Sequence, residues 1–264
     1  MLIGVVISDR RQSIIADILE EYQKHVIRIL SNDDLSNDID VLVLPIRGIN
    51  ENCILQINNV VLDFSSFFIS AKKDLVIYSG ITCKFLEQLP FKVKKLLNNE
   101  EVTNYNSKLT AQGLLIDLLM NIDIALDETS IDIIGFGHSG KAIYKMFSKL
   151  CPNIRIVSSQ NMSIFEDFPV NMIYYEMFKN TNDYSKIIIN TAPIMIIDRF
   201  ILDKLDTNHI ILDIASIPGG TDFDYALCKG VKALLLPALP SKYVGYSAGK
   251  ILGEQIVKDI DSNE

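Results

Sequence analysis

Three glycines near the middle of the chain are spaced as a phosphate-binding turn requires. Gly135, Gly137 and Gly140 stand in the segment IDIIGFGHSG with the spacing G-x-G-x-x-G. The apolar run before them predicts a buried strand, and apolar residues at helical spacing follow them. In such a strand–turn–helix unit the first glycine permits the tight turn, the second lets backbone N–H groups approach a pyrophosphate, and the third lets the helix pack closely. The pattern predicts a dinucleotide site at a helix N-terminus, and a glycine turn without a ligand is the weaker alternative.

The side chains in and after this motif bear on which dinucleotide would bind. His138 and Ser139 lie within the motif and are candidate cofactor contacts, although an ordinary loop position is the simpler interpretation of His138. Dinucleotide-binding domains commonly place an acidic residue about 20 positions further on, where it bonds the adenosine ribose. Here the next predicted strand ends at Ser158 and Ser159, without a carboxylate. Small hydroxyl side chains leave room for a 2′-phosphate, so the sequence favours NADP over NAD; the nearest cation, Arg155, lies within the strand and can point elsewhere.

Later loops follow further predicted strands. The segment NTAP follows residues 186–189, and the glycine-rich segment ASIPGGTD follows residues 210–214. Parallel sheets bind ligands in the loops at the carboxyl ends of their strands. A third such loop follows the predicted strand at residues 233–236. We therefore expect additional cofactor contacts from these three loops, at Thr191, Ala192, Pro193, Ala215, Ser216 and Leu239. Thr221 or Asp222 is expected to cap the following helix rather than to catalyse.

The first hundred residues alternate short apolar runs with helical segments. An amphipathic helix is predicted over residues 10–22. The continuous apolar runs are typical of strands buried on both faces of a parallel sheet, and they cover residues 2–7, 26–30, 41–44 and 75–78. Arg47 follows one of these strands, where its guanidinium could bind a carboxylate through two parallel hydrogen bonds. A solvated loop position is an equally good interpretation of Arg47.

These elements predict an α/β protein of two domains. An N-terminal parallel-sheet domain would span residues 1–110, a connecting helix residues 111–126, and a Rossmann domain that binds NAD(P) residues 127–240. The helix itself is predicted to begin slightly earlier, so that it covers residues 109–126, of which residues 111–126 form the connection between the two domains. A final helix from near Ser247 to about Ile260, within residues 241–264, would pack back on the first domain.

Composition excludes several classes of protein. The net charge of −8 argues against nucleic-acid binding. Four widely spaced cysteines and three histidines give no metal-ligand pattern, so no metal is expected. No apolar run approaches the roughly 20 residues that a membrane-spanning helix needs.

Several longer segments resemble one protein family. The blocks ILDIASIPGGTDFDYA, GVKALLLPALP and SAGKIL are similar to the A subunits of bacterial dipicolinate synthases. The segments YSGI and YNS, Thr110 with Gly113, and the glycine motif share the resemblance. It covers nearly the whole chain, is strongest over residues 190–252 and is weakest before Val41.

The resemblance implies an activity and partners. The family makes dipicolinic acid, the pyridine dicarboxylate of bacterial spores, from a dihydrodipicolinate-type intermediate of lysine biosynthesis with NADP as oxidant. It implies a dehydrogenase-like A subunit that works with a flavoprotein-like B subunit in the mother-cell cytoplasm. A dicarboxylate substrate needs hydrogen-bond donors, and we predict that they face a cleft between the two domains. Their residue types and positions make the following residues the candidates: Arg47, Ser79, Gly80, Asn106, Ser107, Thr110 and Ser247. Ser107 and Thr110 could alternatively cap the connecting helix.

Three positions depart from the family by being neutral where relatives often carry charge. They are Gln112, Ile217 and Tyr246. A substrate-binding or proton-transfer role at these positions would be vacant here, and no catalytic residue is assigned. One alternative is therefore a non-catalytic nucleotide-binding subunit that scaffolds or regulates the flavoprotein. Another is a dehydrogenase of a different small carboxylate, but the Lys–Asp pair or His–Glu relay that it would need is not evident.

Overall fold

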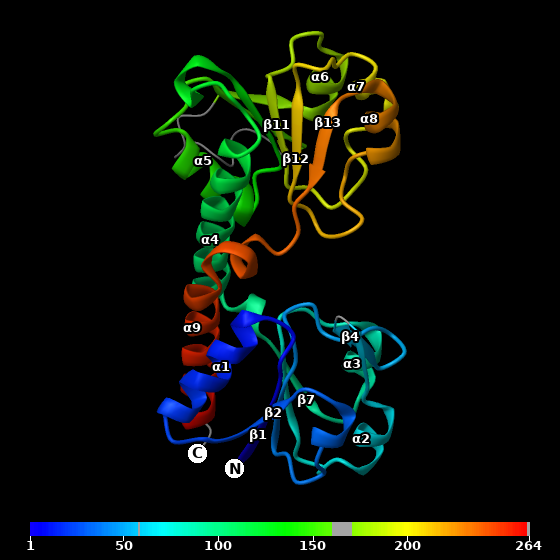
Figure 1. Cartoon of the computed structure of the whole chain (residues 1–264), viewed down its shortest axis with the longest axis vertical. Helices are drawn as coiled ribbons and strands as arrows, with labels where there is room; N and C mark the ends of the chain where they lie inside the picture. The colour runs from blue at the N-terminus through cyan, green and yellow to red at the C-terminus, as the bar shows by residue number, and fades with distance from the viewer. Residues whose placement is uncertain (58, 160–170, 263–264) are drawn as a thin grey trace. The chain divides into compact units, whose positions relative to one another are not determined.

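The structure, a computed structural model, describes residues 1–57, 59–159 and 171–262. The chain forms two compact units (Figure 1). Unit 1 comprises Met1–Asn106 and Ser241–Glu264, and unit 2 comprises Ser107–Pro240.

Unit 1 is built on a five-stranded parallel sheet in the order β2-β1-β3-β6-β7. Its strands are β1 (Leu2–Val6), β2 (His25–Ile29), β3 (Val41–Val43), β6 (Val76–Ser79) and β7 (Lys92–Lys95). Counted within this sheet the order is 2-1-3-4-5, one of the common doubly wound arrangements. A separate antiparallel hairpin joins β4 (Ile54–Ile57) to β5 (Val60–Asp63).

Helices cover both faces of this sheet. They are α1 (Arg10–Glu21), α2 (Ser65–Ser70), α3 (Lys84–Gln88) and α9 (Leu239–Asp261), with short 3-10 turns at Asn32–Asp34 and Leu96–Asn98. Since side chains alternate along a strand, Ile3 and Val5 of β1 join a core with α1 and α9. Val6 faces the opposite way, into a core that contains Phe64 and Phe68.

Unit 2 is built on a six-stranded parallel sheet in the order β10-β9-β8-β11-β12-β13. Its strands are β8 (Ile131–Ile134), β9 (Ile154–Ser158), β10 (Asn171–Tyr174), β11 (Ile187–Asn190), β12 (Ile210–Asp213) and β13 (Lys232–Leu235). Counted within this sheet the order is 3-2-1-4-5-6, which is the Rossmann arrangement. The predicted parallel-sheet α/β fold with a Rossmann domain is confirmed.

The helices of unit 2 connect these strands. They are α5 (His138–Phe147), α6 (Tyr175–Asn180), α7 (Arg199–Leu202) and α8 (Phe223–Lys229), with a 3-10 turn at Leu126–Glu128. The Asp222 carboxylate accepts a hydrogen bond from the Tyr225 backbone N–H at 3.0 Å, so Asp222 caps α8 as predicted.

Two predicted helix boundaries are wrong. Helix α4 (Glu100–Leu119) begins before the predicted residue 109 because Asn99 supplies its first turn with an acceptor, 3.1 Å from the Val102 N–H. It ends before the predicted residue 126, and the Asn121 side chain bonds the Asp117 carbonyl there at 2.7 Å. Ser107 and Thr110 consequently lie inside α4, and the alternative that they cap a helix is wrong.

The last helix also differs from its prediction. Helix α9 begins at Leu239 rather than near Ser247, and it is interrupted by non-helical backbone at Val244 (φ −130°, ψ 38°). Pro240 is compatible with this start because proline is tolerated in the first turn of a helix.

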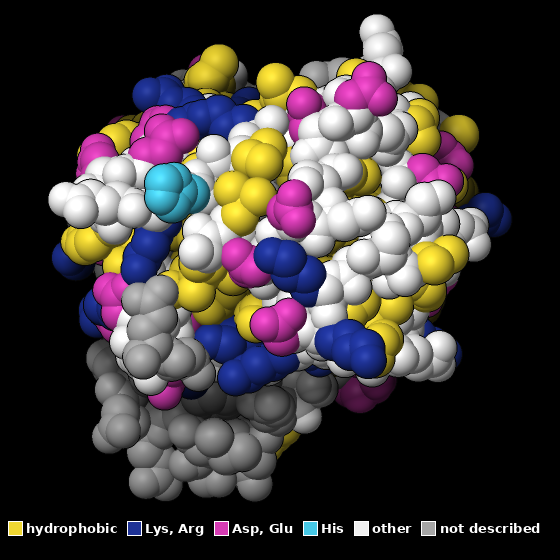
Figure 2. All heavy atoms as spheres, turned by 90° about the horizontal axis from the view of Figure 1, so that it is seen from below, with side chains coloured by type: hydrophobic (Ala, Val, Ile, Leu, Met, Phe, Trp, Pro, Cys, Tyr) yellow, Lys and Arg dark blue, Asp and Glu magenta, His cyan; other side chains and the backbone are white. Residues whose placement is uncertain are grey.

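Charges are mixed over the surface that Figure 2 shows. On that face Lys and Arg side chains are interspersed with Asp and Glu. Among the described residues, no helix combines the length and the apolar character needed to cross a membrane.

Candidate nucleotide-binding site

The three motif glycines occupy different environments at the end of β8. Gly135 has φ +91°, and a Cβ there would collide with the Thr191 hydroxyl. A Cβ on Gly140 would collide with the Gly135 carbonyl oxygen. A Cβ on Gly137, the residue before α5, would have no neighbour within 4 Å. The turn is therefore tightly packed at its first and third glycines and open at the second, beside the N-terminus of α5. A helix N-terminus that is open in this way can bind a phosphate group.

The loop after β11 is hydrogen-bonded to the end of β8, next to this turn. The Thr191 hydroxyl donates to the Ile134 carbonyl at 2.9 Å. The Asn190 side chain binds both polar backbone groups of Ala192, accepting from its N–H at 3.1 Å and donating to its carbonyl at 3.0 Å. These bonds fix the loop at the switch point between β8 and β11, where doubly wound sheets bind ligands.

A buried carboxylate organises the next loop. Asp213, at the end of β12, accepts hydrogen bonds from the Ala215 N–H at 3.0 Å, the Gly220 N–H at 2.8 Å and the Thr221 hydroxyl at 2.8 Å. A Cβ on Gly220 would lie 2.6 Å from the Asn190 amide nitrogen, so the two loops are in close contact. Asp213 is not among the residues predicted from the sequence, where its signal is an acidic residue at the end of an otherwise apolar strand.

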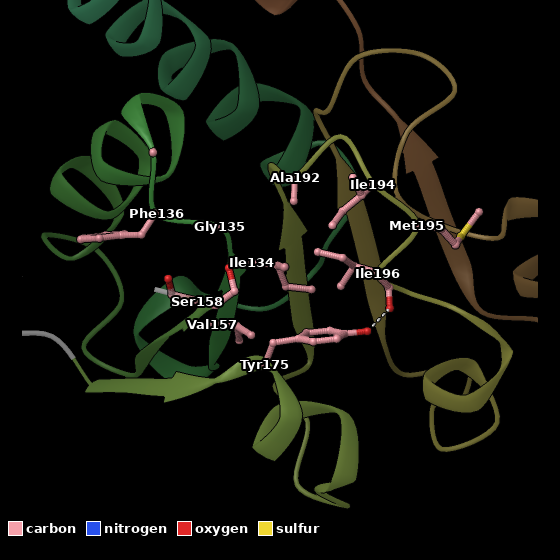
Figure 3. Close-up of a pocket in the computed structure, with 12 residues that line it drawn as sticks. Ile134, Gly135, Phe136, Val157, Ser158, Tyr175, Ala192, Ile194, Met195 and Ile196 are labelled. Carbon is pink, nitrogen blue, oxygen red and sulfur yellow. Dashed lines mark hydrogen bonds between the residues drawn. The ribbon is translucent and has the colours of Figure 1, made fainter. Parts of the chain in front are cut away.

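A cavity of about 280 Å³ opens beside the glycine turn (Figure 3). Its described lining is largely apolar and comes from the ends of β8 and β9, from the segments that follow β8, β9 and β11, and from α6. The lining residues are Ile134, Gly135, Phe136, Gly137, Val157, Ser158, Ser159, Tyr175, Ala192, Ile194, Met195 and Ile196. The Tyr175 hydroxyl donates to the Ile196 carbonyl at 3.1 Å, and burial raises the pKa of Tyr175 above its usual value. Tyr175 is therefore a neutral donor at physiological pH.

The predicted cofactor contacts divide into two groups. Five of them line the cavity: Gly135, Gly137, Ser158, Ser159 and Ala192. The other predicted contacts lie outside its lining: His138, Ser139, Gly140, Thr191, Pro193, Ala215, Ser216 and Leu239. His138 and Ser139 begin α5 rather than standing in a loop. Phe136, Tyr175 and residues 194–196 line the cavity but were not predicted as cofactor contacts. For residues 194–196, the signal in the sequence is that the segment after Pro193 is apolar.

Arg155 points away from the cavity into an ion pair. Its guanidinium donates to both carboxylate oxygens of Asp132, at 2.7 and 2.9 Å, and this hydrogen bonding raises its pKa. Asp132 is fully buried and also accepts from the Ser185 N–H at 2.9 Å. Among the described residues that line the cavity there is no carboxylate, lysine or arginine.

The predicted substrate contacts of unit 1 lie at the carboxyl edge of its sheet or on helices. The buried Ser79 hydroxyl donates to the Ile81 carbonyl, and Gly80 packs so closely on Ile46 that a Cβ there would lie 2.5 Å from the Ile46 oxygen. Arg47 is exposed and donates to the Gln56 carbonyl. Asn106 lies in α4 and Ser247 in α9.

The remaining two, Ser107 and Thr110, belong to the part of α4 in unit 2. Among the described residues, no group of three or more His, Cys, Asp or Glu side chains could hold a metal ion.

The strand order, the glycine turn and the cavity define a protein with a Rossmann unit and a second doubly wound unit. A solved D-isomer specific 2-hydroxyacid dehydrogenase from Lactobacillus delbrueckii ssp. bulgaricus, in its NAD-complexed form, shares the fold with a TM-score of 0.59. It is 13% identical, and the match covers 98% of this chain and 96% of that one. No protein-family model matches the chain.

Three further comparisons identify the family. The A subunit of dipicolinate synthase from Bacillus subtilis is 31% identical over 190 residues, which are 69% of this chain and 64% of that relative. The solved A chain of the Bacillus subtilis dipicolinate synthase matches 100% of this chain and 98% of its own, with 26% identity and a TM-score of 0.85. The solved A subunit of the Bacillus halodurans enzyme matches with a TM-score of 0.88 and 24% identity, over 97% of each chain. The chain belongs to the family of dipicolinate synthase A subunits.

Proposed function

We propose that this chain is the oxidoreductase subunit of a dipicolinate synthase and oxidises dihydrodipicolinate to dipicolinate with NADP. The names of its Bacillus relatives support the product. The dehydrogenase solved with NAD supports a nicotinamide cofactor. The observation that carries the proposal is the open space at Gly137 beside the cavity at the switch point of the Rossmann sheet.

The reaction needs little acid–base chemistry from the protein. Dihydrodipicolinate and NADP⁺ would give dipicolinate, NADPH and one proton. Bound NADP would supply the hydride acceptor, and aromatisation of the ring would supply much of the driving force. The backbone N–H groups at the start of α5 would bind the pyrophosphate, and the apolar lining would exclude water from the adenosine. The protein would then act mainly by positioning its reactants.

The substrate carboxylates would bind to donors at the carboxyl edge of the unit 1 sheet. We assign Arg47 and the backbone of the loop from Ser79 to Gly80 to this role. The Ser79 hydroxyl already donates to Ile81 and is the weaker candidate. Asn106, Ser107, Thr110 and Ser247 are proposed as additional contacts.

The preference for NADP follows from the neutral end of β9. Ser158 and Ser159 line the cavity, and its described lining holds no carboxylate that would repel a 2′-phosphate. Titration of NADPH and of NADH, each followed by its fluorescence, should show at least tenfold tighter binding of NADPH. Equal or tighter binding of NADH would overturn the preference.

We further propose that the chain works with a flavoprotein-like B subunit in the mother-cell cytoplasm of a sporulating bacterium. The designation of the relatives as A subunits supports a multisubunit enzyme. NADPH formation from the lysine-pathway intermediate should be measured with the purified chain alone and with that partner. We expect turnover in at least one of the two assays. Activity on shikimate, with none on the lysine-pathway intermediate, would overturn the assignment of the substrate.

A non-catalytic nucleotide-binding subunit is the second candidate function. It is favoured by the absence of any charged group from the described lining of the cavity. It is also favoured by the exposed, neutral side chains of Ile217 and Tyr246. NADPH binding without turnover, both alone and with the flavoprotein, would establish this candidate.

A further inference from the structure

A fully buried carboxylate in unit 2 takes no part in the reaction proposed above. The Asp213 side chain, at the end of β12, has no exposed surface, and no cation among the described residues pairs with it. It accepts hydrogen bonds only from the loop that follows, at Ala215, Gly220 and Thr221. Burial of a charge costs free energy even when the charge accepts hydrogen bonds, and an apolar residue would end the strand without this cost. The carboxylate therefore calls for a role beyond the stability of the strand.

The loop that Asp213 holds is itself bonded to the segment after β11. The Gly220 N–H donates to the Asp213 carboxylate at 2.8 Å. The Gly220 carbonyl accepts from the N–H groups of Ile196 and Ile197, at 2.8 and 2.9 Å. One residue, Gly220, therefore joins the buried carboxylate to this segment.

This segment forms one wall of the nucleotide cavity (Figure 3). Ile194, Met195 and Ile196 line the cavity, and the first two of these residues are 65% and 58% exposed. The Ile196 carbonyl also accepts from the Tyr175 hydroxyl at 3.1 Å. The backbone of the wall is thus fixed by Tyr175 and Gly220, while the apolar side chains before it are open to a ligand, as the lining of a binding pocket usually is.

Steric contact also couples Gly220 to the wall. A Cβ on Gly220 would collide with the Ile194 carbonyl oxygen and would lie 2.8 Å from the Ala192 carbonyl oxygen. Both oxygens belong to the backbone, so they cannot turn away as the end of a flexible side chain can. A shift of Gly220 toward the wall therefore displaces the cavity lining itself.

We propose that Asp213 is a positioning residue of the nucleotide site, which acts through Gly220 to hold residues 194–195 against the adenosine half of the dinucleotide. This role rests on the proposed NADP function. The adenosine half is assigned because the two serines at the end of β9 line the same cavity, and the ribose of a dinucleotide lies near the end of this strand in a Rossmann sheet. Loss of the carboxylate loosens the wall and lowers the affinity for NADPH.

The substitution Asp213→Asn tests this role with little change in side-chain size. An amide offers one acceptor oxygen where the carboxylate uses two, so the N–H of Ala215 or of Gly220 loses its acceptor. Thr221→Val is the matched control, because it removes one hydrogen bond from the same carboxylate and leaves both backbone bonds in place. Gly220→Ala is the second test, because it keeps the carboxylate and displaces the wall directly.

Two measurements separate positioning from general destabilisation. In the ligand-free full-length protein, Asp213→Asn should speed the amide hydrogen exchange of Ile196 and Ile197 at least tenfold, by NMR, and Thr221→Val should not. Adenosine 2′,5′-bisphosphate, the adenosine half of NADP, should bind Asp213→Asn and Gly220→Ala at least tenfold more weakly than the parent by calorimetry. Thr221→Val should bind it within twofold of the parent, and NADPH should give the same ratios. Removal of a negative charge would by itself favour an anion, so weaker binding to Asp213→Asn identifies an effect of position.

Equal affinities of Asp213→Asn and Thr221→Val for the bisphosphate would overturn the proposal, as would unchanged exchange at Ile196 and Ile197 in Asp213→Asn. If Asp213→Asn does not fold, Gly220→Ala decides, and parent-like binding of the bisphosphate by this variant would contradict the role of the wall. A parent that binds neither NADPH nor the bisphosphate would contradict the proposed function. The exchange measurement needs no ligand, so it would show separately whether Asp213 holds the wall.

Discussion

At the residue scale, the glycine motif combines two kinds of constraint. Gly135 and Gly140 are required by the packing of the turn, because a Cβ at either position would collide with neighbouring atoms. Gly137 is not required by packing, and its backbone (φ −77°, ψ −162°) is open to any residue. A substitution at Gly137 therefore separates ligand binding from folding.

Gly137→Val should weaken NADPH binding at least tenfold, which is about 1.4 kcal/mol. The branched side chain would occupy the space through which a phosphate approaches the N-terminus of α5. Stability should change by about 1 kcal/mol or less, since only a helix-flanking glycine is replaced. Fluorescence titration and urea unfolding measure the two effects.

Gly140→Val is the matched control. Its side chain would meet the Gly135 carbonyl, so it should cost about 2–3 kcal/mol of stability, as overpacking does. Unchanged NADPH affinity in Gly137→Val would remove the glycine turn from the cofactor site.

A substitution of Arg155 tests whether this cation contributes to nucleotide binding. Arg155→Gln should lower the free energy of unfolding by about 3 kcal/mol, because it leaves the buried Asp132 carboxylate without its bidentate partner. NADPH affinity of the folded variant should stay within twofold of the parent, since Arg155 points away from the cavity. A selective loss of NADPH over NADH affinity would instead assign Arg155 to the 2′-phosphate.

At the element scale, the N-terminus of α1 links stability to pH. Burial alone would raise the pKa of Asp9, but hydrogen bonds and charge attraction from Arg11 outweigh it and hold the pKa below its usual range. A lowered carboxyl pKa stabilises the fold above the unfolded-state value of about 3.9, and this contribution is lost as pH falls through the folded-state value.

Asp9→Asn should therefore destabilise the protein at pH 7 and lose this effect toward pH 3, while the helix cap is kept. Urea unfolding of parent and variant at pH 7, 5 and 3 tests the convergence. A difference in stability that stays constant over this range would assign the effect to packing rather than to the charge of Asp9.

Helices α1 and α9 pack at a distance that glycine sets. A Cβ on Gly249 of α9 would lie 2.7 Å from both the Arg11 carbonyl oxygen and the Ile14 Cβ of α1. A Cβ on Gly245, one turn earlier, would lie 3.4 Å from the Arg10 Cβ, an ordinary contact. The same substitution should therefore have opposite effects at the two positions.

Gly249→Ala should destabilise unit 1 by about 1–3 kcal/mol, because overpacking against backbone outweighs the gain of about 1 kcal/mol in helix propensity. Gly245→Ala should be neutral or stabilising. Urea unfolding of the two variants compares them directly. A stabilising Gly249→Ala would mean that α9 can move away from α1 at no cost.

Helices and strands whose side chains are buried were easier to predict from the sequence than those at the edge of a sheet or at the surface. Strands buried on both faces, such as β8 and β11, were found because their side chains are continuously apolar. Strand β7 was missed because its sequence KVKK lies at the sheet edge and carries three lysines. The boundaries of α4 were misjudged because its polar first turns resemble a loop, although Asn99 followed by Glu100 and Glu101 is a cap signal.

The candidate site was less predictable than the fold. The glycine turn was recognised because its spacing is local in the sequence. Tyr175 and Met195 reach the cavity only because β10 and β11 are placed on either side of β8 and β9 in the sheet, which no local pattern encodes. Asp213 was missed for a related reason: its three hydrogen-bond donors follow it in a loop whose path is set by tertiary contacts.

At the scale of the whole molecule, the chain is two doubly wound units with separate cores. The proposed dinucleotide site lies wholly within unit 2, since every described residue lining its cavity belongs to residues 107–240. Chains with separate cooperative units do not unfold as one two-state system. A ligand that binds one unit should therefore stabilise that unit first.

Saturating NADPH should slow amide hydrogen exchange in unit 2 and leave most of unit 1 unchanged. At a concentration 100 times the dissociation constant, the expected stabilisation is about 2.7 kcal/mol, or roughly a hundredfold slower exchange of the amides that open only by unfolding of that unit. Peptides that contain β8, β11 and the start of α5 should be protected, and those of β1 and β3 should not. Exchange mass spectrometry measures both sets in one experiment, with Gly137→Val as the control that should abolish the protection. Equal protection of β1 and β8 would show that the cofactor stabilises both units together, and protection that survives in Gly137→Val would place the nucleotide away from the glycine turn.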